Sequence, residues 1–236
     1  MAISETLSGE DFNALGFEWA GNRLQGRVPM NIKFDGPIGK PRAYDFNADL
    51  TPGTISFLPL THTKESGARA SLSGRLDIAV EAGTRVLAFS YEEEGETPVT
   101  GRADFTGANL SRITMPIFDL GDMKNVAFGL TEIGGYRQVS LRATKFLVND
   151  PVAAAFGNAG SSDRLFSESI NAILGDNFSI EAQIDTLDGS HEERLDGFRL
   201  IINATDGRYE RMQLQGTFAD GSELFGDLTR TSPNLR

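Results

Sequence analysis

The chain of 236 residues contains no cysteine, only two histidines and a single tryptophan. The absence of cysteine excludes disulfide bonds, thiolate metal sites and a cysteine nucleophile. It fits both a reducing cytosol and a Gram-negative periplasm, where a protein avoids unwanted oxidation. Long apolar runs are also missing, since no window approaches the ~18 consecutive apolar residues of a transmembrane helix. The N-terminal "MAISETLSGEDF" has no basic flank and no apolar run. Both ends are abrupt, so we expect a fragment of a longer protein.

Basic side chains are too few and too scattered to form an interface with nucleic acid. The 22 lysines and arginines stand against 33 acidic residues, which gives a net charge of −11. Nothing in that distribution attracts a phosphate backbone. An apolar share of 39% with 9% aromatics is typical of a folded chain, and 26 glycines indicate many turns. The composition therefore predicts a turn-rich folded protein that does not bind nucleic acid.

Catalytic motifs are missing as well. There is no HExxH, no GxSxG, no P-loop and no dinucleotide fingerprint. His62 lies in "PLTHTKESG" and His191 in "DGSHEERLDG", and both segments are polar and turn-like. We interpret both histidines as exposed loop residues. The sequence thus predicts a protein that is not an enzyme and needs no cofactor.

Two acidic turns and one aromatic pair suggest ligands but have simpler explanations. The turns, at 92–96 and 185–196, do not follow the spacing of a calcium loop, so we favour solvated hairpin tips and expect no metal. Phe17 and Trp19 could form a platform on which a sugar stacks. A buried packing cluster is the interpretation we prefer.

The strongest positive signal is an alternation of side chains with a period of two. In "ASLSGRLDIAV" at 70–80, small or apolar residues occupy the even positions, whereas Arg75 and Asp77 stand between them. Successive side chains of a strand point to opposite faces, so this segment has one apolar and one polar face. The same pattern recurs at 28–34, 44–50, 139–143, 178–184, 198–202 and 212–218.

Turn signals such as Asp-Gly pairs separate these segments and predict roughly a dozen strands of a mostly antiparallel meander. Only two short helices are expected. Residues 8–16 form one, with Ser8 as the N-cap and Gly16 as the stop, and residues 161–175 form the other. Such a meander can close as a sandwich or barrel, or curl into an elongated groove with an apolar lining. Periodicity does not separate these two folds.

The order of the segments resembles the periplasmic β-rich region of the AsmA-like superfamily, particularly its YhdP-type branch of Gram-negative bacteria. The first segment on which the resemblance rests, 50–80, contains a strand, a link with Leu-Pro, Lys and Gly, and an alternating strand. The others are "GRADFTGANL" at 101–110, "YRQVSLRATKFLVNDP" at 136–151 and the closing hairpins at 195–230.

The resemblance implies an all-β, elongated and curled sheet that forms a groove, with residues 1–236 as a single β-rich segment of a longer periplasmic region. It implies a parent protein anchored in the inner membrane that bridges the inner and outer membranes. Phospholipid acyl chains would move along the apolar groove, and no catalytic residue would be needed. The residues expected to line the groove are Leu72, Leu76, Ile78, Val80, Val139, Leu141, Phe178, Ile180, Ile184, Leu200, Ile202, Leu214 and Phe218.

Two other interpretations remain open. The first is a closed β-sandwich of a secreted or surface protein that binds carbohydrate or another protein, with its function at Trp19 or the acidic hairpin tips. In that fold the thirteen lining residues would form an ordinary core. The second is an enzyme that uses His62 or His191 together with carboxylates.

Overall fold

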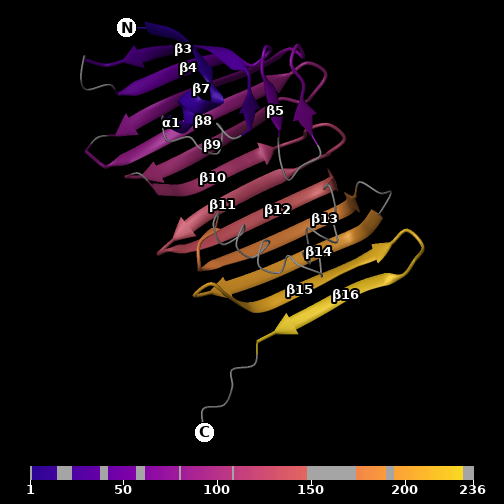
Figure 1. Cartoon of the computed structure of the whole chain (residues 1–236). Coiled ribbons are helices and arrows are strands. Elements are labelled where there is room, and N and C mark those ends of the chain that lie inside the picture. Colours follow the sequence, from indigo (N-terminus) through magenta and orange to yellow (C-terminus); the bar gives the residue numbers. More distant parts are fainter. Residues whose placement is uncertain are drawn as a thin grey trace. The chain divides into compact units, whose positions relative to one another are not determined.

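The computed structural model describes residues 2–14, 23–37, 42–56, 62–79, 81–107, 109–147, 174–189 and 194–230. Most of these residues lie in β-strands (Figure 1). The chain divides into two compact units, Met1–Gly121 and Asp122–Arg236. The larger sheet of the first unit has seven strands, and the sheet of the second unit has six. The predicted all-β, mostly antiparallel fold is confirmed.

The first unit contains the sheet order β1-β3-β4-β7-β8-β9-β10, in which every pair is antiparallel. A small separate sheet has the order β2-β5-β6. The strands are β1 (Ala2–Ser8), β2 (Leu24–Gln25), β3 (Arg27–Asp35), β4 (Ala43–Asp49), β5 (Thr54–Ser56), β6 (Thr63–Lys64), β7 (Ala70–Ala79), β8 (Thr84–Glu93), β9 (Val99–Thr106) and β10 (Asn109–Ile117).

The second unit has the order β11-β12-β13-β14-β15-β16. Its pairs are antiparallel except β12 and β13, which run parallel. A two-residue turn joins β14 to β15, where Asp206 and Gly207 have φ values of 52° and 69°. The strands are β11 (Ala127–Ile133), β12 (Tyr136–Leu147), β13 (Phe178–Asp188), β14 (Arg194–Thr205), β15 (Arg208–Phe218) and β16 (Glu223–Thr229).

Helix α1 (Gly9–Ala14) begins at a reciprocal cap that confirms the expected role of Ser8. The backbone N–H of Asp11 donates to the Ser8 hydroxyl oxygen at 3.3 Å, and the backbone N–H of Ser8 donates to the Asp11 carboxylate at 2.7 Å. Each residue thus satisfies a donor that the first turn leaves unpaired. The bonds from Ser8 hold the pKa of Asp11 below its ordinary value. Gly16 and almost all of the helix predicted over 161–175 lie outside the described residues.

Strand β7 lies between β4 and β8, and its apolar side chains are on the same sheet face as apolar side chains of both neighbours. Leu72 lies opposite Ala48 of β4 and Tyr91 of β8. Leu76 lies between Tyr44 and Leu87 in the same way. Apolar rows of this kind run across the middle of β7, because the register pairs positions 72, 74 and 76 with apolar residues of both neighbours. Towards the ends of the strand, Ala70 lies opposite Glu93 and Ile78 opposite Arg85.

Two glycines on the apolar face of the first unit lie under aromatic rings. A Cβ atom at Gly74 would lie 2.5 Å from Cζ of Phe46 and 2.7 Å from the carbonyl oxygen of Ala88. A Cβ atom at Gly101 would overlap the ring of Phe89, its partner across the ladder. The rings therefore occupy the space that a side chain would fill, and they cover backbone that glycine would otherwise leave open to water.

The buried cores of the two units differ in the size of their side chains. Alanines contribute much of the first, so the large apolar residues around them stay partly accessible. Its buried apolar residues include Val28, Ala43, Ala48, Leu50, Ala70, Tyr91, Val99, Ala103 and Leu120. Those of the second unit include Leu130, Phe146, Phe178, Ile184, Leu187, Leu195, Phe198, Ile202 and Leu214.

Candidate functional site

In the first unit, the predicted lining residues form one apolar stripe along β7. Leu72, Leu76 and Ile78 are half-buried, and they lie on the face opposite Arg75 and Asp77, which are exposed. Val80 lies outside the described residues. Because each of the three side chains keeps some accessible surface, this stripe can contact an apolar ligand without rearrangement of the backbone.

Aromatic residues extend the stripe onto the neighbouring strands. Leu76 is paired with Tyr44, whose ring meets Phe34 of β3 edge to face, with ring centroids 5.2 Å apart. On the other side of β7, Leu76 is paired with Leu87. Phe34, Tyr44 and Leu87 are all half-buried. The apolar surface around Leu76 thus spans four consecutive strands, β3, β4, β7 and β8.

The opposite face of β7 is ionic. The Arg75 guanidinium lies 3.0 Å from the carboxylate of Asp45, 2.8 Å from that of Asp77 and 3.5 Å from that of Asp35. Hydrogen bonds to Asp77 and Asp45 raise the pKa of Arg75. The two faces of this sheet therefore differ in chemistry as the alternation predicts, one apolar and one charged.

In the second unit, the register brings the predicted residues into two adjacent rows. Val139, Ile180 and Ile202 form one row across β12, β13 and β14. Leu200 and Leu214 are opposite each other in the next row, which Ala182 of β13 connects to Leu141.

Burial divides these residues into two groups. Four of the predicted residues, Phe178, Ile184, Ile202 and Leu214, are at most 3% exposed and belong to the packed core. Five others keep part of their surface accessible, namely Val139, Leu141, Ile180, Leu200 and Phe218.

Lys64 is a buried charged residue that sequence reasoning missed. Its side chain is 0% exposed, and its ammonium donates to the carbonyl oxygens of Leu50 at 2.5 Å, Thr51 at 3.0 Å and Gly53 at 2.6 Å. Burial lowers the pKa of Lys64, against the opposing effect of nearby carboxylates. The cation holds the turn after β4 by binding three of its carbonyl oxygens. Two of these also accept backbone N–H groups, Leu50 from Gly53 and Thr51 from Gly67. Lys64 is therefore a structural group with three hydrogen-bond acceptors. In the sequence, only the Lys and Gly of the 58–67 link pointed to this position.

His62 belongs to a second polar cluster, so its interpretation as an exposed loop residue is wrong. Nε2 of His62 lies 2.8 Å from a carboxylate oxygen of Glu93, and their side chains are only 12% and 9% exposed. The same oxygen accepts the Tyr91 hydroxyl at 2.6 Å. Burial, followed by this hydrogen bond, raises the pKa of Tyr91. The cluster connects the segment before β6 to the end of β8. Glu93 also lies near enough to Lys64 for its charge to oppose the lowering of the Lys64 pKa by burial. His191 lies outside the described residues.

The acidic turns contain no metal centre within the described part of the chain. No group of three or more His, Cys, Asp or Glu side chains there could hold a metal ion. Glu92 and Glu94 point to solvent, whereas Glu96 accepts the backbone N–H of Gly121 at 2.9 Å. Asp188 forms an ion pair with Lys145 at 3.1 Å. Phe17 and Trp19 lie outside the described residues.

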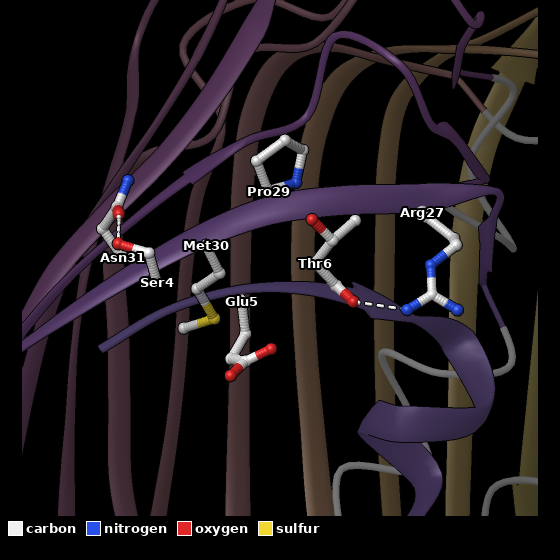
Figure 2. A pocket seen from close by; sticks show the side chains of 7 residues that line it. All are labelled: Ser4, Glu5, Thr6, Arg27, Pro29, Met30 and Asn31. Carbon is white, nitrogen blue, oxygen red and sulfur yellow. Dashed lines mark hydrogen bonds between the residues drawn. The ribbon is translucent and has the colours of Figure 1, made fainter.

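A hollow of about 340 Å³ lies along β1 and β3 at the N-terminal edge of the first unit (Figure 2). Its polar groups partly satisfy one another. The Ser4 hydroxyl donates to Oδ1 of Asn31 at 2.5 Å, and Arg27 donates to the carbonyl oxygen of Thr6 at 2.6 Å. The lining residues are Ser4, Glu5, Thr6, Arg27, Pro29, Met30 and Asn31. Most of them are exposed to solvent, so the hollow offers little enclosure to a ligand.

Within the described residues, no helix has the length and apolar character needed to cross a membrane. Comparison with known proteins found no matching family model, no matching curated protein and no matching solved structure. The likeness to the AsmA-like superfamily thus stays a prediction from the sequence pattern, and the apolar stripes of the two units are the features from which a function can be argued.

Proposed function

We propose that this protein is a non-enzymatic component of a Gram-negative cell envelope, and that its apolar sheet faces guide phospholipid acyl chains between the inner and outer membranes. The observation that carries the proposal is the apolar stripe of β7 and its neighbours. Leu72, Leu76 and Ile78 are half-buried there, and Leu72 and Leu76 have apolar partners on both sides. A periplasmic location is part of the same proposal.

An acyl chain is the ligand that such a stripe suits best. Each methylene removed from water contributes about 0.8 kcal/mol, and the contribution depends on apolar area instead of direction. Acyl chains therefore need a continuous dry surface and few polar contacts. The stripe around Leu76 supplies apolar side chains from consecutive strands, whereas the charges of Arg75 and Asp77 lie on the opposite face.

Strand alternation provides matched test positions. Leu76 and Asp77 are sequence neighbours on opposite faces of β7, and Ile180 and Glu181 are neighbours on opposite faces of β13. We would place a photo-crosslinking amino acid at each position in turn, irradiate intact cells that produce the protein, and analyse it by mass spectrometry. We expect phospholipid adducts at Leu76 and Ile180, and none at Asp77 and Glu181.

The controls distinguish the proposal from a closed binding module. Circular dichroism of each purified variant must show β-structure equal to that of the parent protein. If all four folded variants lack lipid adducts, the apolar face covers only itself, and the carbohydrate- or protein-binding sandwich becomes the better explanation. Equal amounts of lipid adduct at Asp77 and Leu76 would show that lipid contacts both faces of β7 alike, which also contradicts the proposal.

A further inference from the structure

Arg85 is a cation on the apolar face of the first unit. In β8 it lies opposite Ile78 of β7 on one side and opposite Phe105 of β9 on the other. Side chains two positions apart in a strand share a face, so Arg85 is on the same face as Leu87, the partner of Leu76. The row of side chains next to Leu76 therefore contains a positive charge.

The guanidinium of Arg85 keeps donors available for a ligand. The side chain is half-buried, its Cζ lies 5.7 Å from the centroid of the Phe105 ring, and it donates to the carbonyl oxygen of Gly107 at 2.5 Å. Among the residues that the structure describes, no carboxylate forms an ion pair with it. A guanidinium has several N–H groups, so the bond to Gly107 leaves others to accept an anion from solvent.

A second arginine lies at the same end of β7. Arg42 precedes β4, and its carbonyl oxygen accepts the backbone N–H of Ile78 at 2.8 Å, so Arg42 and Arg85 are on either side of Ile78. Glu81, in the turn between β7 and β8, is exposed and forms no ion pair with either arginine in the described part of the chain. Three other carboxylates of this end lie on the opposite face around Arg75, namely Asp35, Asp45 and Asp77.

The other end of the apolar stripe is covered. Along β7, burial increases from Ile78, which is half-buried, to Ala70, which is 5% exposed. Tyr91 is 6% exposed at the corresponding end of β8. The turn before β5 packs here, since a Cβ atom at Gly53 would lie 3.1 Å from Cγ1 of Val28, which is 0% exposed. The stripe thus has one covered end and one accessible end, and the cation lies at the accessible end.

We propose that Arg85 binds the phosphate of a phospholipid whose acyl chain lies along the stripe, directed from Ile78 toward Ala70. The inference rests on the lipid function proposed above and adds to it an anionic head group and an orientation. Guanidinium and phosphate form strong, charge-assisted hydrogen bonds with matching geometry. From Arg85 to Tyr91 the strand rises about 20 Å, more than the roughly 15 Å that one leaflet contributes to a bilayer core. One acyl chain therefore fits between the cation and the covered end.

Two lipids that differ only in the phosphate test the role of Arg85. We would titrate the whole chain with a lysophosphatidic acid and with a monoacylglycerol of the same acyl chain, both below their micelle concentrations, and measure affinity by calorimetry. Arg85→Gln should weaken binding of the lysophosphatidic acid about five- to tenfold, because a charged donor is lost, and leave binding of the monoacylglycerol unchanged. The matched control is Arg102→Gln, which removes the same charge from an exposed position on the polar face of β9. It should change neither affinity by more than about twofold.

Photoreactive lysophospholipids test the orientation independently. One probe carries its reactive group beside the phosphate, and the other carries it at the end of the acyl chain. Trypsin cleaves after Arg69, Arg75 and Arg85, so the two ends of β7 fall into separate peptides, 70–75 and 76–85. Mass spectrometry should find the head-group probe mainly on 76–85 and the chain-end probe mainly on 70–75.

The outcomes separate this inference from the proposed function. If the parent protein binds neither lipid, the lipid function itself is wrong. If both lipids bind but Arg85→Gln weakens them equally or not at all, the lipid function stands and the phosphate site is wrong. The reverse labelling pattern would contradict the orientation. Inorganic phosphate that binds as tightly as the lysophosphatidic acid would indicate a site for a free anion, which also contradicts the inference.

Discussion

At the scale of single residues, the most constrained group is the ammonium of Lys64. Removing a buried charge from water is unfavourable unless hydrogen bonds replace the lost solvation. Lys64 meets this condition with three backbone carbonyl oxygens, all from residues 50–53. Its role is therefore to hold the turn that follows β4 and leads into β5 of the small sheet.

We predict that Lys64→Met lowers the free energy of unfolding by roughly 1–3 kcal/mol, because the turn loses its three hydrogen bonds from a charged donor. Methionine keeps an apolar stem of similar length but removes the ammonium. Urea unfolding followed by circular dichroism measures the change. Lys33→Met is the control, because Lys33 is exposed on β3, and it should change stability by no more than about 0.5 kcal/mol. Equal effects of the two substitutions would contradict the structural role of Lys64.

At the scale of strands, the first unit is organised by aromatic rings that cover glycines. Phe46 of β4 covers Gly74 of β7, and Phe89 of β8 covers Gly101 of β9. Glycine ordinarily weakens a strand because it has no side chain to pack. Here its lack of a Cβ atom is what leaves room for the ring of the neighbouring strand.

This arrangement predicts that Gly74→Ala destabilises the protein by about 1–3 kcal/mol through overpacking. The new methyl group would meet the Phe46 ring and also the backbone oxygen of Ala88, which cannot rotate away. The midpoint of urea unfolding measures the effect. Gly216→Ala provides the comparison, because a Cβ atom there finds only ordinary contacts, the nearest at 3.6 Å. A Gly74→Ala protein as stable as the parent would show that the ring is not held as described.

The parallel pairing of β12 and β13 is also explained at this scale. A hairpin turn forces antiparallel neighbours, whereas parallel strands need a connection of about a dozen residues or more. The chain leaves β12 at Leu147 and enters β13 at Phe178, so the intervening residues are long enough to return it to the same end of the sheet. Every other connection between sequence-adjacent strands within the second unit is short, and those pairs are antiparallel.

At the scale of the whole molecule, both units share one design, a sheet with an apolar face and a polar face. In the first unit the apolar face is half-buried, with Leu72, Leu76 and Ile78 as examples. In the second unit Phe178, Ile184, Ile202 and Leu214 form a tightly buried core, with half-buried residues beside them. If the faces bind acyl chains as proposed, affinity should follow apolar contact and respond little to salt.

We predict that the protein binds single-chain phospholipids with an affinity that rises between about twofold and fourfold for each added methylene, the upper value corresponding to about 0.8 kcal/mol. Titration calorimetry with a series of lysophospholipids below their micelle concentrations measures this dependence. Changing the head group at constant chain length serves as the control and should have a smaller effect. Affinity that is independent of chain length, or that collapses at high salt, would contradict the proposed function.

The sequence by itself determined the strands, their two faces and the cap of α1, because these features depend on residues close together in the chain. An alternation of apolar and polar residues can be recognised in the sequence wherever one face of a strand is apolar, as in 70–79. The reciprocal bonds of Ser8 and Asp11 likewise join residues three positions apart. The antiparallel neighbours followed from short connections with turn residues.

Only the tertiary structure decided how deeply each apolar residue is buried and which polar residues meet. Ile180 and Ile184 occupy equivalent positions in the same alternating strand, yet Ile180 is half-buried and Ile184 is 2% exposed, because burial depends on what packs against each position. His62 and Glu93 lie 31 residues apart in the sequence, each in a polar segment that predicts solvent exposure. Their contact arises because the small sheet returns the chain to the end of β8, a long-range event that no local pattern encodes.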